Sequence, residues 1–159
     1  MDLSADGDLT SVETIETWMH SGKRGIFKLF DENDPRRPDV DHPVEIESIT
    51  RDGSPEEYVE VDSSRGIRNV RIGNEFVYLD PGAHTYEIAS RTVDVFEPGD
   101  DGETLWWWDV VGSGWQMEMD AVDISVQLPA EPIRAECVQG ESTACRAVIE
   151  GRSLRVRTG

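Results

Sequence analysis

The stretch "AVDISVQL" (residues 121–128) alternates strictly between apolar and polar side chains. In an extended chain, successive side chains point to opposite faces. The apolar residues therefore share one face: Val122, Ile124, Val126 and Leu128. This pattern predicts a strand of an antiparallel sheet, with one buried face and one solvated face, that ends at Pro129.

Similar patterns recur along the chain, whereas helical periodicity is nearly absent. A long strand is predicted over residues 84–96. Because its apolar residues change phase, we expect a β-bulge within residues 89–92 or a crossing between sheets. Shorter strands are predicted at residues 12–19, 24–30, 44–51, 57–62, 68–72, 132–138, 145–150 and 153–157. We therefore predict an all-β chain, a two-sheet antiparallel β-sandwich of immunoglobulin-like or related topology, as a single domain over residues 1–159.

Acidic side chains dominate the composition, with 33 Asp and Glu against 15 Lys and Arg and a formal charge of −18. This charge argues against nucleic-acid binding and against docking on anionic lipid. No run approaches the ~18 apolar residues of a membrane-spanning helix. The acidic start is unlike a signal peptide. The chain alone is thus expected to be soluble, with the acidic loops at residues 31–43 and 97–103 exposed.

Four of the five tryptophans lie in "LWWWDVVGSGW" (residues 105–115). A strand over residues 105–111 would place Trp106 and Trp108 on one face and Trp107 on the other. Aromatic side chains dominate β cores, so we interpret Trp106 and Trp108 as core residues and expect Trp115 to cap the end of the sandwich. Two alternatives remain: Trp107 belongs to an exposed patch that binds sugar or protein, or the tryptophans form a membrane-interface belt.

Two longer segments carry a family resemblance: "RIGNEFVYLDPGAHTYEIASRTVDVF" (residues 71–96) and "LWWWDVVGSGWQMEMDAVDISVQLP" (residues 105–129). They resemble the extracytoplasmic N-terminal domain of the YciQ-like family of bacterial predicted membrane proteins, domain of unknown function 2207. The shared motifs are Arg-Ile-Gly at 71–73, Gly-x-His-Thr-Tyr at 82–86, an aromatic strand ending in Gly-Trp at 114–115, and Leu-Pro at 128–129. "KRGIFKLF" (residues 23–30) is similar to the family's Arg-Gly-Ile-Tyr/Phe motif.

The resemblance implies a membrane protein of unknown biochemical function. Members combine a secretory signal, a β-rich domain outside the membrane, transmembrane helices and a glycine-rich tail. This places the chain on the extracytoplasmic side of the cell membrane, anchored only through segments absent from this chain. The sequence departs from the family pattern at Ala83, Asp109, Val111 and Ser113.

Cys137 and Cys145 are the only cysteines. An even count in an exported domain indicates a disulfide, which would close a short loop. Free buried thiols are the alternative. A metal site is disfavoured because this spacing lacks the CxxC form and two further ligands would be needed.

The sequence contains no recognisable set of catalytic residues. His84 is interpreted as a strand residue whose ring hydrogen-bonds a neighbour, and His20 and His42 as surface residues. Asp109 is the one acid in an apolar segment, so it is the candidate for glycoside hydrolysis. We interpret it instead as an acceptor for backbone amides at the Gly112–Gly114 turn, because the family usually has Asn at this position. Calcium is conceivable at residues 31–41 or 97–103, although neither matches an EF-hand loop.

These observations predict a non-enzymatic binding or interaction domain of a membrane protein, with no cofactor and no metal. The partner would be an unknown protein or a cell-envelope polymer. The alternative function is carbohydrate or cell-wall polymer binding through exposed tryptophans. Trp107 and Trp115 are the candidate contacts, and Asp109 is a further candidate.

Overall fold

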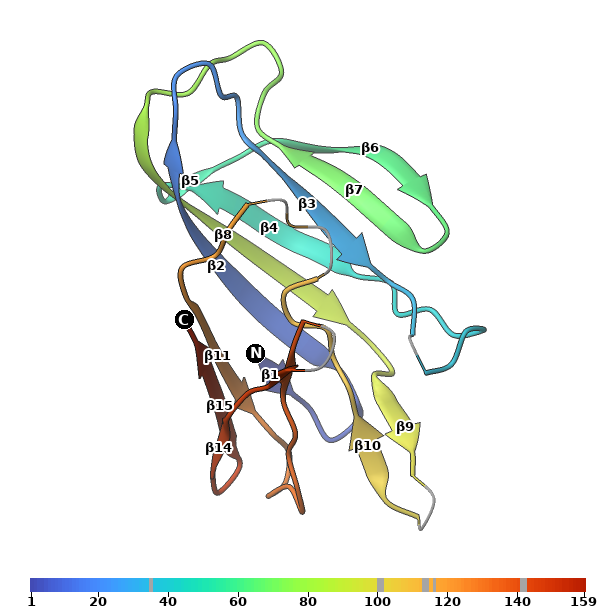
Figure 1. Cartoon of the computed structure of the whole chain (residues 1–159). Helices are drawn as coiled ribbons and strands as arrows, with labels where there is room; N and C mark the ends of the chain where they lie inside the picture. Colours follow the sequence, from blue (N-terminus) through green and yellow to red (C-terminus); the bar gives the residue numbers. More distant parts are fainter. Residues whose placement is uncertain (35, 100–101, 113–114, 116, 141–142) are drawn as a thin grey trace. The chain divides into compact units, whose positions relative to one another are not determined.

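The structure is a computed structural model, and it describes residues 1–34, 36–99, 102–112, 115, 117–140 and 143–159. None of these residues is helical, and strands of antiparallel sheets make up most of the regular structure (Figure 1). The predicted all-β class is therefore confirmed. One pairing is parallel, between Asp2 of β1 and Gln127 of β11.

The chain divides into two compact units. The first unit comprises Met1–Thr10, Asp94–Val110 and Gln116–Gly159, and the second comprises Ser11–Val93 and Val111–Trp115. The strand β2 (Leu9–Met19) begins in the first unit and continues in the second. The single domain over residues 1–159 stays a prediction, and each unit has its own hydrophobic core.

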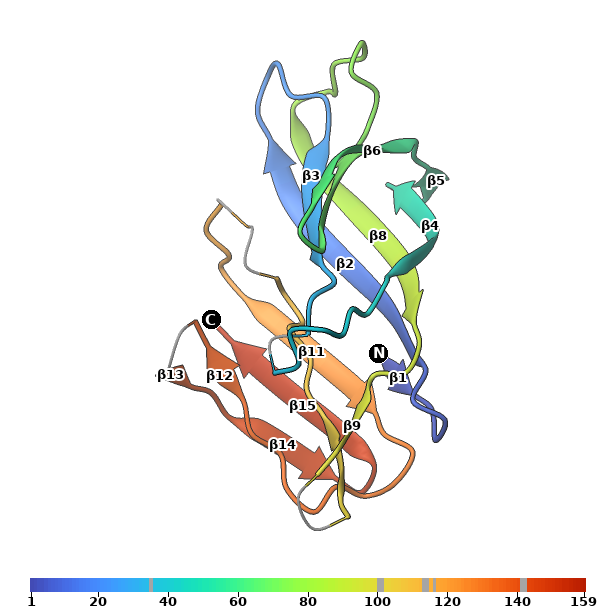
Figure 2. The same cartoon turned by 90° about the vertical axis from the view of Figure 1, so that its right-hand side faces the viewer.

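The second unit is a two-layer sandwich (Figure 2). One layer has the strand order β2-β8-β4-β5 and the other the order β3-β7-β6. Its strands besides β2 are β3 (Ile26–Asp31), β4 (Glu45–Arg51), β5 (Ser54–Pro55), β6 (Tyr58–Ser64), β7 (Ile67–Ile72) and β8 (Gly82–Thr92).

Alternating side chains of both layers fill the core between them. Ile49, Tyr86 and Ile88 come from the first layer, and Val70 and Ile72 from the second. All five are at most 3% exposed. The sandwich predicted from the strand patterns thus describes this unit, and the immunoglobulin-like topology remains a prediction.

The first unit combines a sheet with two short hairpins. The sheet has the order β14-β15-β11-β1, continued by the first residues of β2. The bounds are β1 (Asp2–Leu3), β9 (Phe96–Pro98), β10 (Thr104–Trp106), β11 (Val122–Gln127), β12 (Val138–Gln139), β13 (Thr143–Ala144), β14 (Ala147–Glu150) and β15 (Ser153–Thr158). Its core contains Leu3, Leu9, Val95, Val126 and Leu128.

Three strand predictions need correction. The predicted strand over residues 84–96 ends at Thr92, because Asp94 adopts a left-handed φ of 55°, and the chain then enters the first unit. In the pairing of β4 with β8, the register irregularity lies on β4, between Ile46 and Ser48, opposite Ser90 and Ala89. The predicted strand over residues 105–111 ends at Trp106, and residues 132–137 form no strand.

Candidate functional site

A tight hairpin turn fixes the first acidic residue of the candidate site. Asp52 and Gly53, with φ values of 51° and 78°, join β4 to β5. Asp-Gly is the preferred pair for such a two-residue turn, because both positions need positive φ. The Asp52 amide donates to the Thr85 carbonyl over 2.8 Å, and the Thr85 amide donates to Asp52 Oδ1 over 2.9 Å. Asp52 is thereby held against the start of β8.

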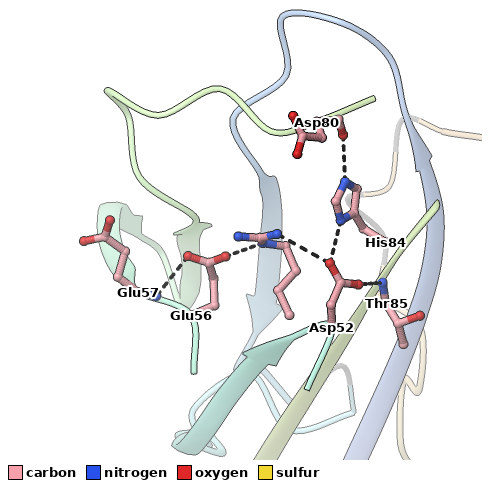
Figure 3. Close-up of polar contacts among 7 residues, drawn as sticks. Asp52, Glu56, Glu57, Asp80, His84 and Thr85 are labelled. Carbon is pink, nitrogen blue, oxygen red and sulfur yellow. Dashed lines mark hydrogen bonds and ion pairs between the residues drawn. The ribbon is translucent and has the colours of Figure 1, made fainter. Parts of the chain in front are cut away.

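His84 lies between Asp52 and Asp80 (Figure 3). Its Nδ1 is 2.7 Å from Asp52 Oδ2, and its Nε2 is 2.8 Å from the Asp80 carbonyl oxygen. Both partners are acceptors, so both ring nitrogens donate, which only the protonated imidazole can do. The hydrogen bond to Asp80 and then the one to Asp52 raise the pKa of His84. Neither nitrogen is left to bind a metal or to take a proton from a substrate.

Arg51 extends this arrangement to Glu56. Arg51 Nε donates to Glu56 Oε2, and Arg51 Nη1 is 3.4 Å from Asp52 Oδ2. Figure 3 shows the contacts running from Glu56 to His84 with charges of alternating sign. We name Arg51, Asp52, Glu56, Asp80 and His84 the His84 network. Arg51 and His84 pair with the carboxylates of Asp52 and Glu56, and Asp80 takes part through its backbone carbonyl. Such a hydrogen-bonded network is typical of a structural anchor.

Tyr86 lies beside this network, opposite Arg51 in the pairing of β8 with β4. The side chain is fully buried, and its hydroxyl has no hydrogen-bond partner among the described residues. Burial raises the pKa of Tyr86 to about 12, so the phenol stays neutral at physiological pH.

The His84 network holds the base of a loop that presents apolar side chains to solvent. This loop, residues 73–81, connects β7 to β8. Leu79 is buried and its amide donates to the Lys23 carbonyl over 2.8 Å, while Asp80 accepts from His84. Between these anchors and Gly73, the side chains of Phe76, Val77 and Tyr78 are 83%, 53% and 60% exposed.

A second loop, residues 20–25, lies directly against the first. A Cβ on Gly25 would be 1.9 Å from the Ile72 carbonyl oxygen, and one on Gly73 would be 2.3 Å from the Arg24 carbonyl oxygen. The two backbones can therefore touch only because both residues are glycine. The Arg24 guanidinium lies 4.3 Å from the centre of the Tyr78 ring and also donates to its hydroxyl.

We name the exposed residues here the loop end of the second unit. Trp18, which is 66% exposed, lies one residue before β2 ends and leads into residues 20–25. Both loops lie at the same end of the strands they join, at the top of Figure 1. The loop end consists of Trp18, Lys23, Arg24, Phe76, Val77 and Tyr78.

The structure divides the predicted binding residues between the two units. Trp107 follows β10 in the first unit and is 45% exposed, and Asp109 is exposed as well. The neighbouring Trp106 and Trp108 pack against the core of the first unit. Asp109 lies outside any strand, and the turn at which we expected it to accept hydrogen bonds includes residues 113 and 114, which lie outside the described residues.

Trp115 belongs to the second unit, where its half-buried ring lies with Phe27, Leu29 and Val111 around a small cavity. Its indole nitrogen donates to the Val111 carbonyl over 3.0 Å, and Lys28 Nζ is 5.4 Å from its ring. Trp115 therefore covers part of the outer face of β3.

Cys137 and Cys145 form the predicted disulfide, with Cα atoms 5.0 Å apart. The bridge flanks the hairpin of β12 and β13, and the Cys145 amide donates to the Cys137 carbonyl over 3.0 Å. It closes the short loop that contains this hairpin.

The acidic loop at residues 31–43 is less exposed than expected. Asp34 and His42 are only 3% and 9% exposed, which corrects the interpretation of His42 as a surface residue. Asp34 accepts from the amides of residues 36 and 37 and pairs with the side chains of Arg37 and His42. Burial alone would raise the pKa of Asp34, but these hydrogen bonds outweigh it and lower the pKa to about 2.

Calcium binding at residues 31–41 or 97–103 stays a prediction. The Asp34 carboxylate is engaged within its own loop, and Glu97 is buried in β9. No group of three potential metal-ligating side chains occurs within the described part of the chain. Residues 35, 100 and 101 lie outside that part.

The loop end is the feature that sequence reasoning missed. "FVY" (residues 76–78) precedes a Pro-Gly turn, and residues 17–30 contain no acid although the chain has 33. These two signals were available, but which apolar side chains stay exposed depends on tertiary packing.

The geometry defines an all-β domain that presents an exposed, firmly held pair of loops. The chain belongs to the family described as predicted membrane protein (DUF2207), and the model of the N-terminal domain of that family matches residues 1–157. No curated protein and no solved structure was found to match the chain. Within the ranges that the structure describes, no helix is long and apolar enough to cross a membrane.

Proposed function

We propose that this chain is a non-enzymatic interaction domain of a membrane protein and that it works outside the cytoplasmic membrane. The observation that carries the proposal is the loop end, where three consecutive apolar side chains are exposed on a loop anchored at Leu79 and Asp80. Contiguous exposed apolar side chains mark binding surfaces. An anchored loop also loses little conformational entropy on binding.

The chemistry of the titratable groups supports a non-enzymatic role. His84 uses both ring nitrogens in hydrogen bonds, and Asp34 is buried and ion-paired. General acid–base catalysis needs a group that reaches the substrate with an open donor or acceptor position. These two groups are instead engaged in holding loops.

The disulfide supports the extracytoplasmic location. Disulfides form and persist in oxidising compartments and are rare in the cytosol. In the full-length protein, we expect Cys137 and Cys145 to resist thiol alkylation until a reductant is added.

Photo-crosslinking in the full-length protein tests the interaction surface. A photoreactive phenylalanine at position 76 should give an adduct, whether to protein, polymer or lipid. The same group at position 12, where Val12 is 61% exposed on β2, is the matched control. If position 76 gives no more adduct than position 12, the proposal is wrong.

Carbohydrate or cell-wall polymer binding is the second candidate function, and the exposed indole of Trp107 favours it. Sugars stack on exposed aromatic rings, so binding should change tryptophan fluorescence. Trp107→Ala should abolish that change, whereas Trp18→Phe should preserve it. A response that persists in Trp107→Ala would exclude this surface.

A further inference from the structure

We infer that the loop end of the second unit docks on an anionic lipid surface, with its aromatic side chains in the headgroup region and Lys23 and Arg24 among the lipid phosphates. The inference deepens the proposed function by naming the partner of the same surface, and it rests on that function. It depends on side-chain chemistry, local charge and the fixed geometry of the two loops.

The side chains at the loop end suit a membrane interface. Trp and Tyr favour the boundary between hydrocarbon and water because their rings are amphipathic, while Phe and Val favour the hydrocarbon side. Trp18 and Tyr78 are 66% and 60% exposed, and Phe76 reaches 83%. The Arg24 guanidinium stacks on the Tyr78 ring, which places a cation at the level of the phenol.

The loop end contains two exposed cations, Lys23 and Arg24, and the acids of the same two loops are Glu75 and Asp80. Residues 17–30 form the longest stretch without an acidic residue and contain both lysines of the protein. Lys28 is buried against Glu13, so Lys23 is the exposed one. Among the acids close by, Glu75 pairs with Arg71 at 3.3 Å and the Asp80 carboxylate lies at the base of the loop.

The overall charge of −18 then acts as an orienting force. Acidic surface is repelled by anionic lipid, but at physiological ionic strength this repulsion decays over a Debye length of about 8–10 Å. Lys23 and Arg24 therefore determine which part of the second unit can approach the bilayer. Repulsion disfavours orientations that turn an acidic surface toward the bilayer.

The loops are held in place before they meet a partner. Gly25 and Gly73 allow backbone contact, Leu79 is buried, and the loop base is hydrogen-bonded to His84. Pre-organised contacts bind with little ordering cost. A membrane-anchored protein also keeps such a surface close to lipid, which raises its effective concentration there.

Vesicle cosedimentation of the 159-residue chain tests the inference. The chain should bind phosphatidylcholine vesicles that contain phosphatidylglycerol, bind pure phosphatidylcholine less, and lose binding as salt is added. Phe76→Ser should weaken binding about tenfold or more, as expected from burial of one aromatic side chain. Lys23→Glu should weaken binding to the anionic vesicles selectively.

Two matched variants control for general effects of polarity and charge. Val12→Ser removes an exposed apolar side chain elsewhere on the second unit. Arg155→Glu reverses an exposed charge in the first unit, where Arg155 lines an open groove with Arg146 and Arg157. Both variants should bind as the unaltered chain does. Equal losses in these controls, or no binding to anionic vesicles at about 0.1 M salt, where the Debye length is about 10 Å, would overturn the inference.

Fluorescence quenching by brominated lipid identifies which tryptophan enters the interface. Quenching should disappear in Trp18→Phe and persist in Trp107→Phe. The reverse pattern would assign membrane contact to Trp107 and overturn the inference. If crosslinking at position 76 yields a protein adduct while vesicles do not bind, the proposed interaction function stands and the lipid partner is wrong.

Discussion

His84 donates hydrogen bonds from both ring nitrogens, so the folded arrangement requires the protonated imidazole. The sequence alone indicated that its ring would bond a neighbour. The two acceptors, the Asp52 carboxylate and the Asp80 carbonyl, come from separate turns and could not be identified from spacing. Their arrangement connects the pKa of one side chain to the position of the exposed loop.

The raised pKa of His84 predicts a pH-dependent stability. Because the folded pKa is higher than the unfolded one, the contribution is complete below the unfolded pKa of about 6.5 and disappears as pH rises through the folded pKa. His84→Gln should therefore be less stable than the unaltered chain at acidic pH, and the difference should shrink towards alkaline pH. Urea denaturation at several pH values measures this.

His20→Gln is the control for this experiment, because His20 is exposed and lies in the neighbouring loop. It should leave the pH profile of unfolding unchanged. A stability difference for His84→Gln that is constant across the pH range would contradict the charged arrangement.

The contribution of Asp34 to stability is expected to have the opposite pH dependence. Its pKa is lowered to about 2, so its contribution to stability is complete above the unfolded pKa of about 3.9 and is lost as pH falls through 2. Asp34→Asn should cost about 2 kcal/mol at neutral pH. In acid, the two proteins should approach equal stability, which thermal unfolding can detect. A cost that stays the same at low pH would contradict the ion-paired state.

At the scale of elements, alternation of apolar residues predicted most of the strands well. Residues 121–128 were expected as a strand, and β11 covers Val122–Gln127. The prediction succeeds because a strict alternation of apolar and polar side chains leaves only one face of the strand that can be buried. The tryptophan segment did not follow, since apolar side chains on both faces give no unique register. Trp106 and Trp108 nonetheless pack against a core, and Trp107 is exposed.

The contact between the two exposed loops rests on glycine. Gly25→Ala would bring a Cβ to 1.9 Å from a carbonyl oxygen in a conformation with φ of 145°, so the backbones must separate. We expect a loss of stability of about 2 kcal/mol or more, which includes about 1 kcal/mol or more of backbone strain. Chemical denaturation of the purified variant measures this loss.

Gly22→Ala is the matched control, because Gly22 also has a positive φ, of 84°, but faces open space. It should lose only the strain contribution, about 1 kcal/mol. Equal losses in the two variants would show that loop contact contributes nothing.

The disulfide stabilises the hairpin of β12 and β13. Replacing both cysteines by serine should lower the free energy of unfolding by about 2–3 kcal/mol in the chain-entropy model. Reduction of the unaltered chain should lower its melting temperature to about that of the variant. The melting temperature of the variant should not change on reduction. A melting temperature that does not respond to reduction would contradict a stabilising bridge.

At the scale of the whole molecule, the composition does not show where the charged and the exposed aromatic side chains lie. The formal charge of −18 is a sum over the whole chain, and it led to the expectation that the chain avoids anionic lipid. Two loops distant in sequence, residues 20–25 and 73–81, place the exposed cations Lys23 and Arg24 beside exposed aromatic side chains. The sequence could not predict this, because the pairing of the loops depends on the fold of the second unit.

Amide hydrogen exchange of the 159-residue chain, with and without phosphatidylglycerol-containing vesicles, tests the central claim most directly. The claim is that this domain meets its partner through the loop end. Added vesicles should slow exchange in peptides covering residues 17–25 and 73–79 and leave the peptides around Trp107 unchanged. Protection that falls instead on residues 105–110, or protection spread evenly along the chain, would contradict it.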